Sequence, residues 1–374
     1  MVSGVTATGV YQLELDWKRL KGGPVMGHMS CVGTFREEDG SEAVLCPRTI
    51  LRRAVERAAA AGLTFLIGFE IEFTMLERTG DPTEKYRMIP HDGQAWSMAR
   101  SLASWGASGS VNKAFEEMLR NLQSCAKVEQ SHAEAGPGQY EIVLAPETPL
   151  EACDTLIHAR QIIESTAARH GFRATLHPRP FAGGIGNGAH AHMSITSPHG
   201  DCSAVYERFY GGILAHFGAV FAFTNSHPAS YERMVDGMWA GGRWVTWGVH
   251  NKQAPLRKCK NSHWEVKVMD GMANPYLAMA ALINAGTAGA EFTWRDCEED
   301  PATLSSAERS ALGIKEQMPR NLGEALGALQ KDATMVKLMG EQVVERFVAV
   351  KKAEIELMGS MSEADQRTWV LDRY

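Results

Sequence analysis

The sequence predicts an α+β protein in which an antiparallel sheet with one polar face is packed by helices and followed by a helical C-terminal part. Three observations predict this architecture. Four short segments alternate polar and apolar residues, apolar residues at helical spacing occur between them, and no repeat or low-complexity linker interrupts the chain. The 374 residues are 44% hydrophobic, which is enough to bury a large core.

The N-terminal part is expected to form a hairpin, a helix and a strand. After a Gly-Gly-Pro break at Gly22 to Pro24, an EEDGS turn is flanked by SCVGTF and EAVL, which predicts a β-hairpin. A helix then begins at Pro47 and ends at Gly62, because Pro favours the first helical turn and Gly the end. The next element is the GFEIEF strand.

The middle of the chain alternates helices and strands. A loop is expected from Thr79 to Gln94, since it contains two prolines and a glycine. An apolar stripe predicts a helix from Val111 to Leu122, which leads into EAGPGQYE. A further helix is expected from Thr148 to Gly171, followed by the strand ATLHPRP and by a Gly-rich loop before GNGAHAHMS.

The remaining elements are mostly helical. One helix is predicted from Tyr206 to Phe221, and another from Asn274 to Ala290. The second is apolar nearly all round, so we expect it to be buried. From about Ser305 an apolar stripe at helical spacing continues to the C-terminal region. We find no internal boundary and expect a single domain with a helical C-terminal appendage.

Reactive side chains share one face of each predicted strand. A strand places every second side chain on the same face, and the residues concerned are spaced by two. A solvent-facing sheet is the commonest cause of such alternation, but that face would normally mix Lys, Thr, Ser and Arg. Here it is mostly Glu and His: Glu70 and Glu72; Gln139 and Glu141; His190, His192 and Ser194; and His263, Glu265 and Lys267.

Convergence of these side chains predicts a site for several divalent ions. Clustered carboxylates raise one another's pKa values, and divalent cations remove that cost. Five carboxylates and one imidazole make an oxygen-rich set suited to Mg²⁺ or Mn²⁺. The predicted ligands are Glu70, Glu72, Glu134, Glu141, His190 and Glu265.

Composition excludes several other classes of protein. The seven cysteines are odd in number and contain no C-x-x-C pair, so we expect reduced thiols and neither a structural zinc site nor disulfides. The net charge of −6 argues against non-specific nucleic-acid binding. No apolar run approaches a membrane span, and the N-terminus lacks the features of a signal peptide. We expect a cytoplasmic protein with no nucleic-acid or membrane partner.

The Gly-rich loop GGIGNG lies directly before His190. It is not a P-loop, because no Gly-Lys-Ser/Thr follows, and it is not a dinucleotide fingerprint, because a strand follows where a helix would be needed. Its position suggests that the backbone of Gly186 to Gly188 approaches a small ligand. The alternative is a loop that merely requires positive φ.

Five ordered motifs carry a family resemblance: GFEIEF, EAGPGQYE, GNGAHAHMS, NKQAPLRK and DGMANPYLAMAA. Together they resemble the catalytic domain of the glutamine synthetase superfamily, especially the FluG type and the γ-glutamyl-amine ligases. The resemblance implies a catalytic domain at residues 31–374 with a curved sheet, preceded by an extension at residues 1–30. Family members usually begin with a larger β domain, one loop of which completes the neighbouring subunit's amine site.

The resemblance implies an ATP-dependent carboxylate–amine ligase. In that family, two or three Mg²⁺ or Mn²⁺ ions hold ATP against the γ-carboxylate of glutamate, a γ-glutamyl phosphate forms, and an amine displaces the phosphate. By motif, the metal beside the substrate carboxylate would be held by Glu72, Glu134 and Glu141. The metal on the ATP phosphates would be held by Glu70, His190 and Glu265.

Other roles carried over by motif concern the substrates. Arg257 would meet the ATP phosphates, with Glu129, His192 and Ser194 near the nucleotide. Arg233 would pair with the α-carboxylate of the amino acid, a task suited to a guanidinium fork. The amino group would be received by the loop residues Gly186, Asn187 and Gly188.

Departures from the family pattern fall on the amine site and on two basic positions. Trp239 stands where glutamine synthetases carry a flap glutamate, and an indole could hold an organic cation by cation–π contact. The alternative is that the flap is one residue longer and Trp239 only packs. Lys252 and Lys267 stand where the family usually has Arg, so they lack a bidentate fork.

Three functional hypotheses remain from the sequence. The first is a ligase that forms a γ-glutamyl amide from glutamate or a similar acid, ATP and an organic amine. The second is a catalytically impaired relative with a regulatory or developmental role, and the third is a plain glutamine synthetase. The family resemblance also implies a homo-oligomer, although the short N-terminal region leaves its size open.

Overall fold

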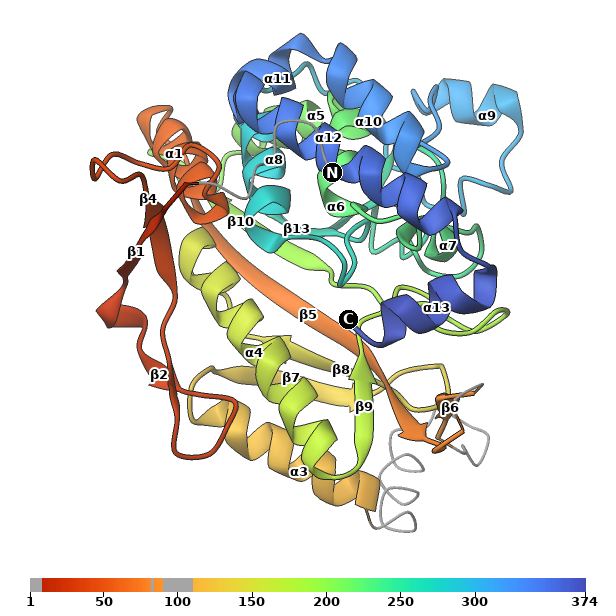
Figure 1. Cartoon of the computed structure of the whole chain (residues 1–374). Coiled ribbons are helices and arrows are strands. Elements are labelled where there is room, and N and C mark those ends of the chain that lie inside the picture. The colour runs from red at the N-terminus through yellow and green to blue at the C-terminus, as the bar shows by residue number, and fades with distance from the viewer. Residues whose placement is uncertain (1–8, 82–83, 90–109) are drawn as a thin grey trace.

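A nine-stranded sheet forms the centre of the computed structural model, which describes residues 9–81, 84–89 and 110–374. Strands β11, β12, β13, β10, β5, β8 and β7 are neighbours in that order, and β6 and β9 both pair with β5, which crosses the molecule (Figure 1). The strands are β5 (Thr64–Arg78), β6 (Tyr86–Met88), β7 (Val128–Ala133), β8 (Gln139–Leu144), β9 (Phe172–Thr175), β10 (Ala191–Thr196), β11 (Trp247–Val249), β12 (Leu256–Lys260) and β13 (His263–Val266).

The predicted α+β class is confirmed, with one parallel strand pair in the otherwise antiparallel sheet. β11 pairs with β12 in parallel. The connection between them is held by Asn251, whose side-chain amide donates to the carbonyls of Cys297 and Glu299. Cys297 also donates its backbone N–H to Trp247, so a distant segment fixes β11 at the sheet edge.

The register aligns the polar side chains in a row across the sheet. On one side of β5, Glu72 lies opposite Glu141, which lies opposite His132. On the other side, His192 lies opposite Glu265, which lies opposite Arg257. Cross-strand partners project from the same face, so the predicted polar face is present.

Helices cover the apolar face of the sheet. Phe69, Ile71 and Phe73 of β5 are at most 1% exposed there. In Figure 1, α3 and α4 lie beside β7, β8 and β9, whereas α8 lies nearer β10 and β13. As predicted, α8 is largely buried, and Asn274 caps it by accepting from two backbone N–H groups. These helices are α1 (Pro47–Ala60), α3 (Ser110–Gln123), α4 (Pro149–Arg169) and α8 (Pro275–Ala288).

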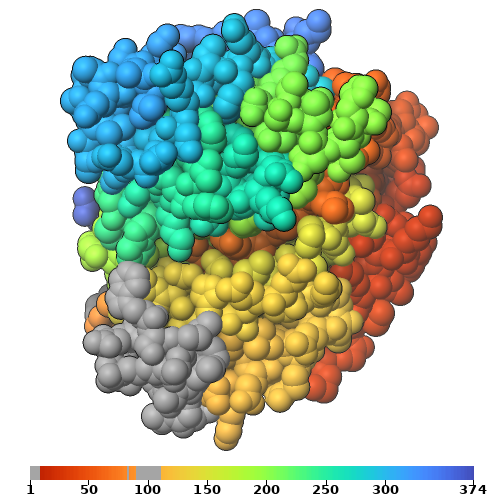
Figure 2. Space-filling model, turned by 180° about the vertical axis from the view of Figure 1, so that it is seen from behind, coloured from red at the N-terminus to blue at the C-terminus, as the bar shows by residue number. Residues whose placement is uncertain are grey.

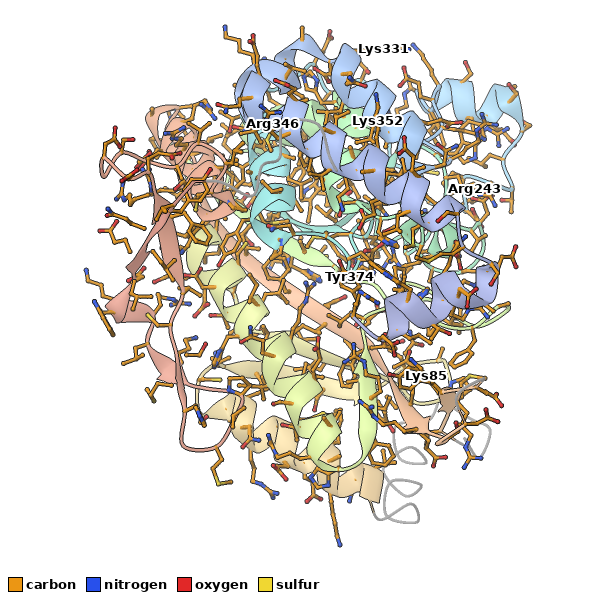
Figure 3. All side chains as sticks on the ribbon, viewed as in Figure 1. Lys85, Arg243, Lys331, Arg346, Lys352 and Tyr374 are labelled. Carbon is orange, nitrogen blue, oxygen red and sulfur yellow. The ribbon has the colours of Figure 1, made fainter. Side chains whose placement is uncertain are left out.

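The C-terminal part is helical, as predicted, and its charged residues include Lys331 and Lys352, which project outward in Figure 3. The single helix expected from Tyr206 to Phe221 is instead two helices that break at His216, whose ring bonds to Asp332 at 2.7 Å. No described helix is both long and apolar enough to span a membrane. The helices are α5 (Ser203–Ala215), α6 (Phe217–Thr224), α7 (Ser230–Arg233), α9 (Ser306–Ala311), α10 (Leu322–Lys331), α11 (Ala333–Met339), α12 (Glu341–Gly359) and α13 (Glu363–Leu371).

The predicted hairpin between SCVGTF and EAVL is wrong. β4 (Gly33–Arg36) pairs with β1 (Gln12–Leu15), and β2 (Lys21–Gly22) pairs with β3 (Met29–Ser30). EAVL contributes only one isolated bridge, between Arg36 and Glu42. β4 pairs with β1 in preference to EAVL because β1 has four residues in register with it, and because Glu14 of β1 accepts a 2.7 Å hydrogen bond from Arg36 of β4.

A buried carboxylate attaches this N-terminal region to the helices. Asp154 of α4 is 3% exposed and accepts from Arg48 of α1 at 3.1 and 3.0 Å. Arg48 also donates to Asp16 at 2.7 Å, and Arg19 lies 3.4 Å from Asp154. The hydroxyl of Tyr276 in α8 donates to the same carboxylate at 2.6 Å. The Asp154 side chain therefore connects helix α4 to the N-terminal region, to α1 and to α8.

Two further boundaries differ from prediction. The strand expected at ATLHPRP lies earlier, because β9 ends at Thr175 before Pro178 and Pro180, which lack backbone donors. The loop expected from Thr79 to Gln94 contains β6, which pairs with the end of β5. The parts of this loop at residues 82–83 and 90–94 lie outside the described residues.

Candidate active site

The polar row, apart from His192, lines a cavity of about 250 Å³. In Figure 2, strand β5 is visible in orange at the bottom of a furrow between the yellow and teal parts of the chain. Strands β5, β7, β8, β12 and β13 contribute to the wall, together with the Gly-rich loop. The lining residues are Glu70, Glu72, Gln130, His132, Glu134, Glu141, Ile185, Gly186, His190, Arg233, Met238, Trp239, Ala240, Lys252, Arg257, Glu265 and Lys267.

Three carboxylates converge on His190, which comes directly before β10. Its Nδ1 lies 2.7 Å from Glu70 Oε2, 3.5 Å from Glu72 Oε1 and 3.2 Å from Glu265 Oε1. Burial would raise the pKa of Glu70, but hydrogen bonds from His190 and His192 outweigh it and hold that pKa well below its usual value. The Glu70 carboxylate is therefore ionised.

A second acidic group surrounds His132 of β7. Its Nε2 lies 2.9 Å from Glu141 Oε1, and its Nδ1 lies 3.4 Å from Glu134 Oε1. Burial, together with the charges of Glu72 and Glu141, raises the pKa of Glu134 to about 7. The hydrogen bond to Glu141 raises the pKa of His132 to about 9. A protonated imidazole thus offsets part of the negative charge.

His132 and Gln130 were missed by the sequence analysis. Gln130, His132 and Glu134 are spaced by two in EQSHAE, which is the alternation that singled out the other strands. β7 and Glu134, the residue that follows it, place all three side chains at the cavity wall. The alternation in this segment therefore predicts a strand, whereas the sequence analysis treats the segment only as the connection that leads into EAGPGQYE.

Basic side chains surround Glu265, which is 1% exposed. Lys267 Nζ lies 3.1 Å from Glu265 Oε1, and Arg257 contacts the other oxygen. Burial opposes ionisation of this carboxyl, but Lys267 and His190 lower its pKa to about 2. Arg233, which is 3% exposed, donates to the Lys267 carbonyl and lies 3.0 Å from His190 Nε2.

The Gly-rich loop is fixed against β5 and β8. Asn187 is fully buried and donates to the His177 carbonyl at 2.9 Å, and the Gln139 amide donates to the Gly186 carbonyl at 2.8 Å. The Gly188 N–H donates to Glu72 Oε2 at 2.6 Å. This loop therefore orients a carboxylate of the cavity.

Gly186 and Gly188 are required because neighbouring atoms lie too close to leave room for a side chain, and not because their φ is positive. Neither has a positive φ. A Cβ at Gly186 would lie 2.5 Å from the Pro178 carbonyl oxygen, and one at Gly188 would collide with the ring of His190. The positive-φ alternative is therefore wrong for these two residues, although it holds for Gly183, with φ 77°.

The cavity brings together the six predicted metal ligands with Arg233, Lys252, Arg257, Lys267 and Trp239. Three residues predicted near the nucleotide do not line it. Glu129 is exposed, 3.5 Å from Lys127. His192 lies behind Glu70, with Nε2 2.8 Å from Glu70 Oε1. Ser194 is half-buried further along β10.

The described donors fit hard divalent ions. Glu70, Glu72, Glu141 and His190 each offer a ligand atom, and these atoms lie within 4.8 Å of one another. His132, Glu134 and Glu141 form a second such group. Both groups are rich in carboxylate oxygen, which suits Mg²⁺ and Mn²⁺. Because Glu141 belongs to both, neighbouring ions could share it.

Comparison with known proteins decides the family. The glutamine synthetase catalytic-domain model matches residues 44–373. The chain belongs to the glutamine synthetase family. This confirms the resemblance predicted from the five motifs.

The relatives of this glutamine synthetase family member include a γ-glutamylpolyamine synthetase. Protein fluG of Emericella nidulans is 39% identical over the whole chain, which spans 43% of that protein's length. The γ-glutamylpolyamine synthetase GlnA3 of Streptomyces coelicolor is 32% identical, over 85% of this chain and 71% of its own. A GmaS/ADP complex superposes with a TM-score of 0.84 at 25% identity, covering 99% of this chain and 87% of its own. The family and these relatives indicate an ATP-dependent ligase.

Metal binding by this glutamine synthetase family member is expected to strengthen as the pH rises towards 7. A divalent ion must displace the proton from Glu134, whose pKa is raised to about 7, so protons compete with the ion below that pH. Mn²⁺ titration by electron paramagnetic resonance between about pH 5 and pH 8 measures the effect. In Glu134→Gln the dependence near pH 7 should disappear. An unchanged pH profile in that variant would contradict the assignment.

Proposed function

We propose that this chain is an ATP-dependent ligase that joins the γ-carboxylate of glutamate to an organic amine. The observation that carries the proposal is one cavity that holds both acidic groups together with four basic side chains. Acidic groups suit divalent ions, and basic groups suit phosphate and carboxylate. The basic side chains are Arg233, Lys252, Arg257 and Lys267.

The reaction has two steps. An oxygen of the γ-carboxylate attacks the γ-phosphorus of ATP, and ADP leaves with the bridging oxygen. The nitrogen of the amine then attacks the carbonyl carbon of the acyl phosphate, phosphate leaves with the electron pair of the C–O bond, and the nitrogen loses a proton. Such transfers depend chiefly on positioning and on neutralising charge.

The residues divide into a substrate side and a nucleotide side. Glu72, Glu134 and Glu141 would hold an ion beside the γ-carboxylate, and Glu70, His190 and Glu265 would hold an ion at the phosphates. Bound ions supply positive charge to the transferred phosphoryl group. Arg257 and Lys252 bind phosphate oxygens, Arg233 binds the α-carboxylate, and the loop at residues 186–188 receives the α-amino group.

An apolar stretch of the cavity wall supports an organic amine as the nucleophile. Met238, Trp239 and Ala240 are consecutive lining residues. Trp239 is 38% exposed and has φ 56°, an uncommon conformation for a bulky residue. An indole face attracts organic cations. One relative, GlnA3, is described as a γ-glutamylpolyamine synthetase.

A panel of amines tests the proposal. We expect glutamate-dependent phosphate release from ATP to rise with alkylamines, arylamines or polyamines more than with ammonium. If ammonium is the best nucleophile across the panel, the organic-amine part of the proposal is wrong. Hydroxamate formation from glutamate, hydroxylamine and ATP tests catalysis itself, because its complete absence in the wild-type protein would favour the catalytically impaired alternative. Loss of hydroxamate formation in Glu134→Ala would support the assignment of Glu134 as a metal ligand.

Trp239→Glu is expected to shift the choice of amine towards ammonium. The added carboxylate attracts a small cation, whereas the lost indole removes apolar and cation–π contact worth about 1–2 kcal/mol. Measured as kcat/KM, the ratio of organic amine to ammonium should fall by roughly 10- to 30-fold. Trp239→Phe is the matched control and should keep most of the preference. Equal ratios in all three proteins would show that Trp239 only packs.

We also infer that the protein self-associates through its N-terminal ribbons, which are the two-stranded sheets β1–β4 and β2–β3 with the turns that connect them. These carry exposed apolar side chains, including Trp17 (69% exposed), Met26 (88%) and Met29 (63%). An interface between subunits at this part of the chain would remove these side chains from water. Light scattering after size exclusion should give more than one chain per particle, and Trp17→Glu should lower the mass. A wild-type monomer at micromolar concentration would exclude this interface.

A further inference from the structure

A cluster of softer ligands lies behind the candidate active site. The side chains of His192, Cys259 and His263 each offer a ligand atom, and these atoms lie within 4.8 Å of one another. His192 Nδ1 is 2.8 Å from His263 Nε2. None of these three residues lines the cavity that holds the oxygen-rich ligands.

A β-bulge in the sheet places the Cys259 thiol beside His192 and His263. The register between β12 and β13 shifts between Lys258 and Lys260, so Cys259 is the extra residue of a β-bulge. Bulges re-aim side chains and recur beside functional sites. A two-residue turn follows, in which Asn261 has φ 50°, and His263 begins the next strand. One hairpin tip therefore carries both a thiol and an imidazole.

The spacing of these side chains is close to that of a metal site. Zn²⁺ binds sulfur at about 2.3 Å and imidazole nitrogen at about 2.0–2.1 Å, which places tetrahedral ligand atoms ~3.3–3.7 Å apart. The two imidazole nitrogens, at 2.8 Å, need to separate by only about half an ångström. All three residues are partly exposed, so an ion can reach them from solvent.

We propose that Cys259, His263 and His192 bind a soft divalent ion of the Zn²⁺ class, at a site that adjoins the carboxylate cluster, since His192 also lies beside Glu70 and Glu265. Thiolate and imidazole select Zn²⁺ over Mg²⁺, whereas carboxylates favour Mg²⁺ and Mn²⁺. Water or another ligand would complete the four-coordinate shell. Binding replaces the proton shared by the two imidazoles and the thiol proton with the metal ion.

His192 connects the proposed site to the active site. Its Nδ1 faces His263, while its Nε2 lies 2.8 Å from Glu70 Oε1. An ion on Nδ1 fixes the ring and its tautomer, as the partners of metal-bound histidines do elsewhere. Zinc can therefore alter the oxygen-rich cluster without entering it.

Cobalt provides a direct test, because thiolate ligation gives Co²⁺ a charge-transfer band in the near ultraviolet. The full-length chain is stripped of metal, excess Mg²⁺ is added to occupy the carboxylate ligands, and Co²⁺ is titrated. We expect a thiolate band that saturates at one Co²⁺ per chain and is removed by Zn²⁺. Absence of the band in the wild-type protein would overturn the proposal.

Variants locate the site. Cys259→Ser should abolish the band, and His263→Gln should weaken Co²⁺ binding on the order of a hundredfold. Cys202→Ser removes another partly buried thiol and is the matched control, which should leave the band intact. Persistence of the band in Cys259→Ser would assign it to another cysteine and reject the site.

Alkylation gives an independent readout on the unmodified sequence. Zn²⁺ should slow the reaction of Cys259 with iodoacetamide by about tenfold or more, measured by peptide mass spectrometry in the presence of Mg²⁺. Cys202 should react at the same rate with and without Zn²⁺. Equal rates for Cys259 would overturn the proposal even if both variants failed to fold, and neither measurement depends on ligase activity.

Discussion

Glu265→Gln is expected to lower kcat for ATP-dependent phosphate release by roughly 1,000-fold. The substitution preserves shape but removes the charge that Arg257 and Lys267 share in a position 1% exposed. It also removes a carboxylate that lies 3.2 Å from His190. Both changes disturb the balance of charge around the phosphates, and phosphoryl transfer depends chiefly on positioning and on neutralising charge.

The matched control is Glu345→Gln, which removes an exposed carboxylate of α12 that lies 3.7 Å from Arg346. Its kcat should stay at the wild-type value. Steady-state kinetics and circular dichroism on both variants separate loss of catalysis from loss of fold. A Glu265→Gln enzyme whose kcat stays within about threefold of wild type would rule out a role for this carboxylate in the chemical step.

The largest effect on stability is expected for Asp154→Ala. The substitution leaves the guanidinium groups of Arg48 and Arg19, which are 11% and 14% exposed, without the carboxylate between them. It also leaves the Tyr276 hydroxyl without its acceptor. Breaking a buried ion pair by removing one partner costs about 3–5 kcal/mol of unfolding free energy.

Urea denaturation measures this cost as a lower midpoint at unchanged slope. Tyr276→Phe removes one hydrogen bond to the same carboxylate and should cost only about 1 kcal/mol. An equal loss in both variants would mean that the hydroxyl, and not the ion pairs with Arg48 and Arg19, stabilises the junction. Limited proteolysis of Asp154→Ala should cut first in the N-terminal ribbons, because their attachment through Arg19 and Asp16 is weakened.

Period-two alternation predicted the polar face well, because that pattern depends only on strand geometry. It placed Glu70, Glu72, Glu141 and Glu265 on one face, and the register joins them. The same rule would have found His132, whose segment also alternates. What failed there was recognition of β7 as a strand, since both of its faces carry polar residues and none of its residues is fully buried.

Strand pairing was harder to predict, because partners are chosen by tertiary contacts. β4 pairs with β1 and not with the nearer EAVL, and β11 runs parallel to β12. Neither result is encoded in local periodicity. At the break between α5 and α6, His216 contacts Asp332, which is 116 residues away in the sequence. The bulge at Cys259 likewise depends on the register of β13.

The central strand β5 has a consequence for synthesis of the chain. Its partners β6, β8, β9 and β10 all follow it, the last ending at Thr196. Phe69, Ile71 and Phe73 therefore leave the ribosome before β8, β9 and β10 can pair with this strand, and before the later helices α3, α4 and α8 can cover its apolar face. Long-range pairing of this kind is slow and exposes aggregation-prone surface. Yield in a foreign host should accordingly depend on holdase chaperones and on slow translation between residues 78 and 196.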